Sequence, residues 1–318
     1  MKGLKIIERR KIFFILSAVL ILIGLLAMPI NAARGQGILN YDIEFKGGSV
    51  MQIELGVDVD TQEDILPIVE EILPNSAPRI QKVTGTTQVI ITMKPTTADE
   101  RTKLYDALAK KYNLTGKKGD YLLKDDNFSP TISPEFKMKA LQAVALGAIL
   151  MLIYISIRFK DFKYGASAVI ALMHNVLIML GVYAVFRVPL NNSFIAAMLT
   201  IIGYSINDTI IIFDRIRENK GKLKGKDEEV INLSVEQTLT RSINTSLTTV
   251  VMVVLLFVLG VSSVKEFAFP LMIGIIAGTY SSIFIASPLY YEMKKYERNH
   301  KKNQKVDNKK KNNKNNKK

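Results

Sequence analysis

The sequence predicts an α-helical polytopic membrane protein with six transmembrane helices and one external α+β domain between helices 1 and 2. Six apolar stretches of about 20 residues, the length needed to cross the hydrocarbon core, carry this prediction. Between the first two, about 100 residues have the mixed composition of a soluble domain. The average composition, 48% hydrophobic with a net charge of +14, hides this pattern because the charge is concentrated in the C-terminal tail.

The predicted spans alternate with short connections in the second half of the chain. They cover residues 12–30, 137–157, 164–186, 193–213, 243–261 and 267–290. The first could instead be a cleaved signal peptide, because basic residues precede it and small residues follow it. Its apolar core is longer than the 7–15 residues typical of signal peptides. We therefore expect a retained helix.

The distribution of Lys and Arg predicts the orientation. Short cytoplasmic segments carry an excess of these residues. The connections on the opposite side hold only Arg187 and Lys265. We therefore expect the chain to lie in the cytoplasmic membrane with both termini in the cytoplasm. Residues 31–136 would then lie outside the cell. The basic segments are the N-terminus 1–11, the turn 158–163, the loop 214–242 and the tail 291–318.

The external domain shows an alternating order of strands and helices. Residues 41–55 read as two strands around the Gly47-Gly48 turn. A helix with one apolar face follows and ends at Pro74, and residues 79–93 predict a hairpin. A Thr97–Glu100 capping box then begins a second helix. The order β, α, β, β, α predicts a ferredoxin-like sandwich, which we expect to bind or to act as a lever.

Several chemistries are excluded by residue content. The chain has no cysteine, which excludes disulfides, thiolate zinc sites and cysteine nucleophiles. Its two histidines, His174 and His300, are too few for a histidine-rich metal centre. There is also no phosphate-binding loop. We expect no cofactor, no metal and no enzymatic activity, so any work must use an ion gradient or the ATP of a partner.

One acidic residue lies deep within the fourth span. Asp208 precedes Asp214 by six residues, which places it about 9 Å inside the cytoplasmic end of the helix. A charge at the centre of a span costs roughly 2.5–3.5 kcal/mol, so such residues have specific roles. Asn207 lies beside Asp208, on the strip of the helix that also holds Gly203.

The fifth span begins with a polar stripe. Arg241, Thr245, Thr248 and Met252 are spaced to share one helix face. Lipid-facing helices do not need such a stripe, so we expect it to point into the bundle, with Arg241 reaching Asp208. Two interpretations stay open: a proton-relay carboxylate countered by an arginine, or a static buried ion pair that fixes helix register.

Two further features lie inside the spans. His174 can shuttle protons or serve only as a hydrogen-bond partner between helices, and the sequence leaves both possibilities open. Gly274 and Gly278 form a small-xxx-small pair, for which close helix packing is the better explanation.

The C-terminal tail is strongly basic. Residues 294–318 contain 12 Lys or Arg residues and 2 acidic residues. Such a composition predicts disorder. The tail can attract anionic lipid, contact ribosomal RNA, or serve only as a solvated segment that enforces topology.

Four segments resemble the SecF family of the resistance–nodulation–division (RND) superfamily. The most specific is IGYSINDTIIIFDRIREN, residues 202–219, which resembles the fourth-span signature. LTRSINTSLTT is similar to the opening of the fifth span, FAFPLMIGIIAGTYSSIFIASPL to the sixth span, and YDIEFKGGSVMQIEL to the first external strand pair. One span, an external domain and five packed spans are also the layout of half an RND-type transporter.

The resemblance implies a proton-driven role in protein export. It implies that Asp208 is the proton-pathway carboxylate and Arg241 its charged partner, in a heterodimer with SecD that acts with the SecYEG channel on a translocating preprotein. At His174-Asn175 the family pattern is His-Asp, so this chain lacks the acid at that position and the resemblance implies no direct proton role there.

Two alternatives remain open: a small-molecule or lipid exporter of the same superfamily, and a scaffold that stabilises a channel without conducting protons. The coupling ion, proton or sodium, is also open.

Overall fold

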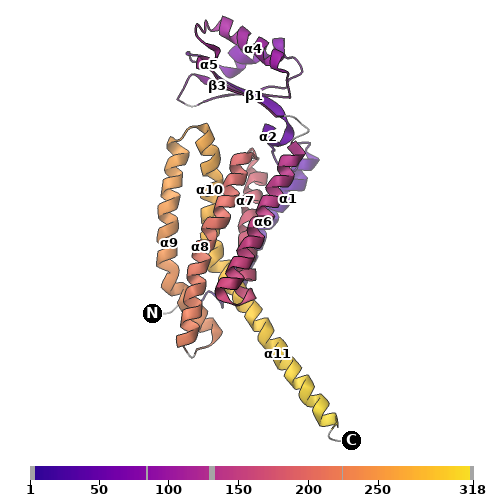
Figure 1. Cartoon of the computed structure of the whole chain (residues 1–318), viewed down its shortest axis with the longest axis vertical. Helices are drawn as coiled ribbons and strands as arrows, with labels where there is room; N and C mark the ends of the chain where they lie inside the picture. The colour runs from indigo at the N-terminus through magenta and orange to yellow at the C-terminus, as the bar shows by residue number, and fades with distance from the viewer. Residues whose placement is uncertain (1–3, 84, 129–132, 224, 316–318) are drawn as a thin grey trace.

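The computed structural model describes residues 4–83, 85–128, 133–223 and 225–315. A helical bundle carries a small α+β domain at one end, and both chain ends lie at the opposite end (Figure 1). Within the described part, six helices are long and apolar enough to cross a membrane, which confirms the six predicted spans. They are α1 (Arg10–Ala33), α6 (Ser133–Phe159), α7 (Phe162–Phe186), α8 (Asn192–Lys222), α9 (Asp227–Leu259) and the last helix, in which α10 (Ser262–Ser281) continues through the π-turn η2 (Ser282–Ala286) into α11 (Ser287–Asn315).

The centre of the bundle consists of α7, α8 and the last helix. In their apolar segments 50–61% of the residues are buried, against 11–17% in α1, α6 and α9. The outer three helices therefore leave most of their apolar surface for lipid or for another subunit.

Small residues allow the closest helix contacts, as they do in many membrane bundles. A Cβ added to Gly24 of α1 would lie 2.4 Å from the Cα of Gly181 in α7. A Cβ on Gly274 of α10 would lie 2.4 Å from the Ile201 side chain of α8, and one on Gly278 would lie 2.9 Å from the Ser205 hydroxyl. The packing role predicted for Gly274 and Gly278 is thus confirmed.

The segment predicted as a cytoplasmic loop, residues 214–242, is largely helical. α8 continues to Lys222 and α9 begins at Asp227. Both extensions are amphipathic, and each buries an isoleucine, Ile216 or Ile231, in the hydrophobic core of the bundle. The N-terminal segment joins them, since the Ile7 N–H donates to Asn232 Oδ1 at 3.0 Å.

The C-terminal tail also differs from its prediction. α11 continues to Asn315, through most of the segment 291–318 for which the composition predicts disorder. Unbranched Lys, Glu, Gln and Met residues have good helix propensity, and the Glu297–Lys301 pair supports the helix at i, i+4 spacing. In Figure 1 this helix projects away from the bundle.

The external domain is a four-stranded antiparallel sheet in the order β2-β3-β1-β4. This is the strand order of the ferredoxin-like sandwich that the sequence predicts. One sheet face is covered by α3 (Leu66–Ile72), which follows the π-turn η1 (Thr61–Ile65), and by α4 (Ala98–Lys111). The strands are β1 (Gly48–Glu54), β2 (Arg79–Lys82), β3 (Gln88–Met93) and β4 (Leu122–Phe128).

Local signals explain most of this domain. The Thr97–Glu100 capping box is present, with the Thr97 N–H donating to Glu100 Oε2 at 2.7 Å. β4 was not predicted, because LLKDDNF lacks a clear apolar alternation. It is an edge strand, and charged side chains are common at edges because they discourage pairing with other chains. The short helix α5 (Lys118–Tyr121) precedes it.

The prediction of a strand before Gly47 is wrong. Residues 43–46 form the short helix α2 (Ile43–Lys46), and the Asp42 side chain accepts a hydrogen bond from the Ile43 N–H at 2.8 Å. The chain just before α2 pairs with the α7–α8 connection, where the Asp42 N–H donates to the Leu190 carbonyl at 2.9 Å. The Asp42 cap and the Gly47 that follows Lys46 are the local features that bound this short helix.

Candidate functional site

Asp208 lies in the interior of the bundle. It is 3% exposed, and α8 directs it toward α9. Its Oδ2 accepts a hydrogen bond from Ser246 Oγ of α9 at 3.3 Å. Oδ1 is buried and has no hydrogen-bond partner among the described residues. In the low-dielectric interior, Asp208 thus has only hydroxyl neighbours, Ser246 within hydrogen-bond distance and Ser242 close by, so its charge is incompletely compensated.

The partner of Asp208 connects it to a third helix. Thr279 Oγ1 of α10 donates to Ser246 Oγ at 2.6 Å, and so α10, α9 and α8 are joined through Thr279, Ser246 and Asp208. Ser242, one turn before Ser246, is also buried on this face of α9. Since hydroxyls both donate and accept, this row of side chains can stabilise Asp208 in either protonation state.

A second polar cluster lies beside the first, between α7, α8 and α10. The Asn175 amide is oriented so that both of its ends form hydrogen bonds. Its oxygen accepts from Ser205 Oγ at 2.9 Å, and its nitrogen donates to Ser281 Oγ at 2.7 Å. One turn further along, the hydroxyls of Thr209 and Ser282 are 2.8 Å apart. Ser205 precedes Asp208 by one helical turn, which makes the two clusters neighbours on α8.

His174 belongs to the second cluster. It is buried, and its Nδ1 is 3.2 Å from the Asn175 amide. Its Nε2 has no hydrogen-bond partner within the described ranges. It contacts the network around Ser205 rather than Asp208 itself, and whether it transfers protons stays a prediction.

The predicted inward face of α9 is wrong by one residue. Arg241 and Thr248 are exposed, Met252 is 62% exposed, and Thr245 is half-buried. The residues that face the bundle are Ser242, Ser246 and Val253. Both stripes carry hydroxyls, so the sequence pattern alone did not distinguish them. Small serines fit the close contact between helices, whereas a buried guanidinium would need a carboxylate within reach.

Arg241 consequently does not form the expected ion pair. Across the part of the chain that the structure describes, it makes no hydrogen bond and no ion pair with Asp208 or another acid. It lies one residue from Ser242 and contributes positive charge near Asp208 without touching it. Among the described residues, the partners of the Thr248 hydroxyl are the Asn244 and Thr245 carbonyls of its own helix.

Asn207 points out of the bundle. It lines a shallow depression between α6 and α8, together with Gly203 and Tyr154. A Cβ on Gly203 would meet no atom within 4 Å, so no helix of the described ranges packs against it.

The network residues that sequence reasoning missed are hydroxyls. Ser246 and Thr279 carry the contacts to Asp208, and Ser205 with Ser281 holds Asn175. The signal that could have identified Ser246 is the i, i+4 pair Ser242–Ser246, which is offset by one residue from the predicted stripe that begins at Arg241 and Thr245.

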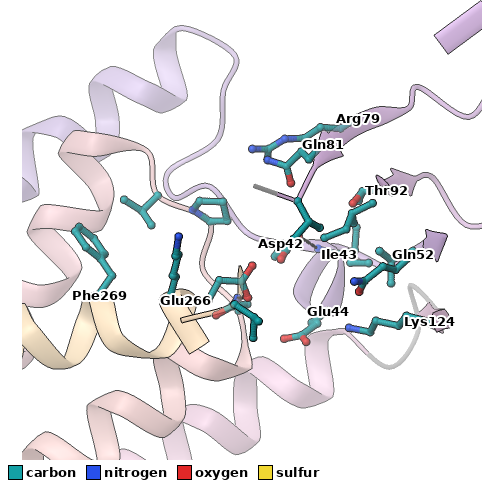
Figure 2. A pocket seen from close by; sticks show the side chains of 18 of the residues that line it. Asp42, Ile43, Glu44, Gln52, Arg79, Gln81, Thr92, Lys124, Glu266 and Phe269 are labelled. Carbon is teal, nitrogen blue, oxygen red and sulfur yellow. Dashed lines mark hydrogen bonds between the residues drawn. The ribbon is translucent and has the colours of Figure 1, made fainter. Parts of the chain in front are cut away.

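A cleft separates the external domain from the bundle. Its volume is about 730 Å³, and the open face of the sheet supplies polar side chains such as Gln52 and Thr92 (Figure 2). The bundle supplies Phe269, Tyr183 and Glu266, and α2, next to the sheet, supplies Glu44. In the described residues, no three acidic or histidine side chains are grouped closely enough to hold a metal ion.

Comparison with known proteins identifies the family. A family model described as protein export membrane protein SecD/SecF, C-terminal, matches residues 110–296. The protein translocase subunit SecF of Sebaldella termitidis is 38% identical over 301 residues, which cover 93% of both chains. The subunit SecF of Petrotoga mobilis is 35% identical over 315 residues, 95% of this chain and 100% of the relative.

Longer relatives match as well. The crystal structure of SecDF, a translocon-associated membrane protein from Thermus thermophilus, superposes with a TM-score of 0.75 at 30% identity. The match covers 92% of this chain and 39% of that one, so the chain corresponds to about two-fifths of the longer protein. The breadth of these matches supports a role in protein translocation. The chain therefore belongs to the SecD/SecF family of protein-export membrane proteins.

Proposed function

We propose that this chain is the smaller half of a proton-driven motor that promotes protein translocation across the cytoplasmic membrane, together with SecD and the SecYEG channel. The observation that carries the proposal is Asp208, a buried carboxyl in the middle of a membrane helix whose neighbours among the described residues are the hydroxyls of Ser246 and Ser242 and no cation in contact. A static structural carboxylate would be expected to have its charge compensated more fully. In this proposal, proton binding at Asp208 alternates with release, and the helices around it shift.

SecD is the expected partner for the outward surfaces. The outer helices α1, α6 and α9 bury little of their apolar length, and α9 presents Arg241, Asn244 and Thr248 outward. Polar groups facing lipid are costly, whereas a second bundle can satisfy them. Relatives whose name joins SecD and SecF in one chain support such a pairing. With both termini in the cytoplasm, the α+β domain lies outside, where an emerging preprotein passes.

The test is export of a secretory precursor into membrane vesicles that contain SecYEG and SecD, with and without this chain. Each preparation is measured with no gradient, a proton gradient and a sodium gradient. We expect the chain to increase export only when the proton gradient is present. Equal stimulation without any gradient would identify a scaffold, and stimulation by sodium alone would identify a sodium-coupled motor. Export of a small molecule instead of the precursor would identify a transporter.

The corrected face of α9 gives a residue-level prediction. Ser246→Ala removes the hydroxyl that joins Asp208 to Thr279, and a hydrogen bond to a charged group contributes about 1.5–3 kcal/mol. We expect gradient-dependent export to fall about tenfold with normal accumulation of the protein. Thr248→Ala is the matched control, because its hydroxyl bonds only to its own helix and should have little effect. A larger loss of export with Thr248→Ala than with Ser246→Ala would show that the face of α9 predicted from the sequence, which includes Thr248, is the one that faces the bundle.

A further inference from the structure

Two segments far apart in the sequence lie against each other at the external end of the bundle. Asn40 Nδ2 donates to the Arg187 carbonyl at 2.8 Å, and the Leu190 N–H donates to the Asn40 carbonyl at 2.8 Å. The Arg187 guanidinium donates to the carbonyls of Gln36 at 2.5 Å and Gly37 at 3.0 Å. Tyr41 and Leu190 form a parallel β-bridge. The connection from α1 to the external domain is thus bound to the α7–α8 connection.

These contacts continue to the beginning of α8. Asn191 caps that helix, since its Oδ1 accepts from the Phe194 N–H at 3.1 Å, and its Nδ2 donates to Glu266 Oε2 of α10 at 2.7 Å. The Asn192 N–H donates to Glu44 Oε2 of α2 at 2.6 Å. Carboxylates are favourable at a helix N-terminus, where the backbone N–H groups have no partner within the helix.

The joint between α2 and the sheet is tight. Gly48 adopts φ +156°, and a Cβ at this position would lie 2.8 Å from both Ile43 Cγ2 and the Met93 carbonyl. Gly47 has a φ of 80°, which also favours glycine. β1 begins at Gly48 and pairs with strands on both sides, so its position is fixed within the sheet. Figure 2 shows Glu44 of α2 and Gln52 of β1 on the same side of the cleft.

We propose that residues 36–44 and 187–192 form a coupling strap through which the external sheet and α8 move as one body. Its purpose rests on the proposed function: Asp208 is on the same helix, about 24 Å from Asn192 at 1.5 Å per residue. An axial shift of α8 at Asp208 then reaches the external domain through these two hydrogen-bonded connections. Glu44 and Glu266 act as positioning residues, because each holds one of the first two residues at the start of α8.

The strap is expected to stay closed when the external medium is acidified. Burial raises the pKa of Glu44, and the Asn192 N–H opposes this shift, with Asp42 and Asp126 raising the pKa and Lys124 lowering it. The carboxyl of Glu266 is also close enough to interact electrostatically with the carboxyl of Glu44. Because the pKa of Glu44 is raised in the folded protein, its carboxyl contributes to the stability of the fold at low pH. This contribution is lost as the pH rises through the raised pKa. The oxygen that accepts from Asn192 remains an acceptor in the neutral carboxyl, so Glu44→Gln should hold the strap and Glu44→Ala should not.

The first test measures the distance between the two bodies and does not depend on export. The chain has no cysteine, so Lys103→Cys on α4 and Phe186→Cys at the end of α7 place two spin labels uniquely. We expect one narrow distance distribution between them in liposomes. Two glycines inserted between Lys46 and Gly47 should at least double its width. The same insertion after Gly56, in an exposed loop with open space around it, is the control and should leave the width unchanged. An unchanged width after the first insertion would overturn the proposal.

The second test locks the strap. Tyr41→Cys with Leu190→Cys places two cysteines at the β-bridge, where an oxidised pair can form. If the strap moves as one body, gradient-dependent export with the oxidised pair should stay within twofold of the reduced form, whereas the Lys46–Gly47 insertion should lower it at least fivefold. Loss of export on oxidation, restored by a reductant, would show that the strap must open, and would overturn the proposal. If the unmodified chain shows no gradient dependence, the proposed motor fails, while the spin-label distances still decide whether the strap exists.

Discussion

Asp208→Asn is expected to abolish the gradient-dependent part of export, by at least tenfold, without lowering the amount of protein in the membrane. Asparagine has the size of aspartate and can still accept a hydrogen bond from Ser246, so the contact between α8 and α9 is kept. It cannot bind and release a proton. Removing an ionisable group from a membrane interior also removes its desolvation cost, so the variant should be at least as stable as the original chain. The measurement is precursor export into vesicles, compared at equal protein with and without a proton gradient.

Asp214→Asn is the matched control for this variant. Asp214 is on the same helix but at the bundle edge, where it forms ion pairs with Arg158 at 3.2 Å and Arg217 at 3.0 Å. Partly exposed ion pairs contribute roughly 0–1 kcal/mol, so we expect less than a twofold effect. Normal gradient-dependent export with Asp208→Asn would remove this chain from the proton pathway. An equal loss with Asp214→Asn would show that the charge of α8, rather than its buried carboxyl, is what matters.

Gly24→Val is expected to have the largest effect on stability. The Cβ alone would lie 2.4 Å from the Gly181 Cα, and neither backbone can move away without separating α1 from α7. Excess volume in a packed interior costs about 1–3 kcal/mol, and here the obstacle is backbone rather than a flexible side chain. Separation would also break the hydrogen bond from Asn31 Nδ2 to the Ala184 carbonyl at 2.9 Å. We expect a loss of about 3 kcal/mol, measured by thermal unfolding in detergent and by protease sensitivity at the α1 end.

Gly147→Val provides the comparison within a membrane helix. A Cβ at Gly147 of α6 would meet nothing within 4 Å, so the valine should be tolerated with a change in unfolding temperature near zero. Equal destabilisation by both variants would mean that valine disturbs these helices through local propensity rather than through the α1–α7 contact. A stable Gly24→Val protein would require α1 to pack elsewhere.

Features that depend on local chemistry were predictable from the sequence. Six apolar stretches have the length of a membrane span, and this requirement does not depend on how the helices pack. The Thr97–Glu100 capping box is satisfied by residues three apart. The placement of Asp208 within an apolar span also followed from the sequence, and the structure buries it there. An acid at such a position is costly whatever surrounds it.

Features that depend on contacts between distant residues were decided only by the tertiary structure. The backbone just before α2 is held by Leu190, almost 150 positions away, a contact that no local pattern reveals. The polar partner of Asp208 is Ser246 rather than Arg241, because a rotation of α9 by one residue exchanges two equally polar stripes. The sequence by itself thus determined which segments cross the membrane and which carboxyl is buried there. The rotation of each helix, and with it the contacts of that carboxyl, was decided by tertiary packing, because small side chains, and not polarity, set which faces can come close together.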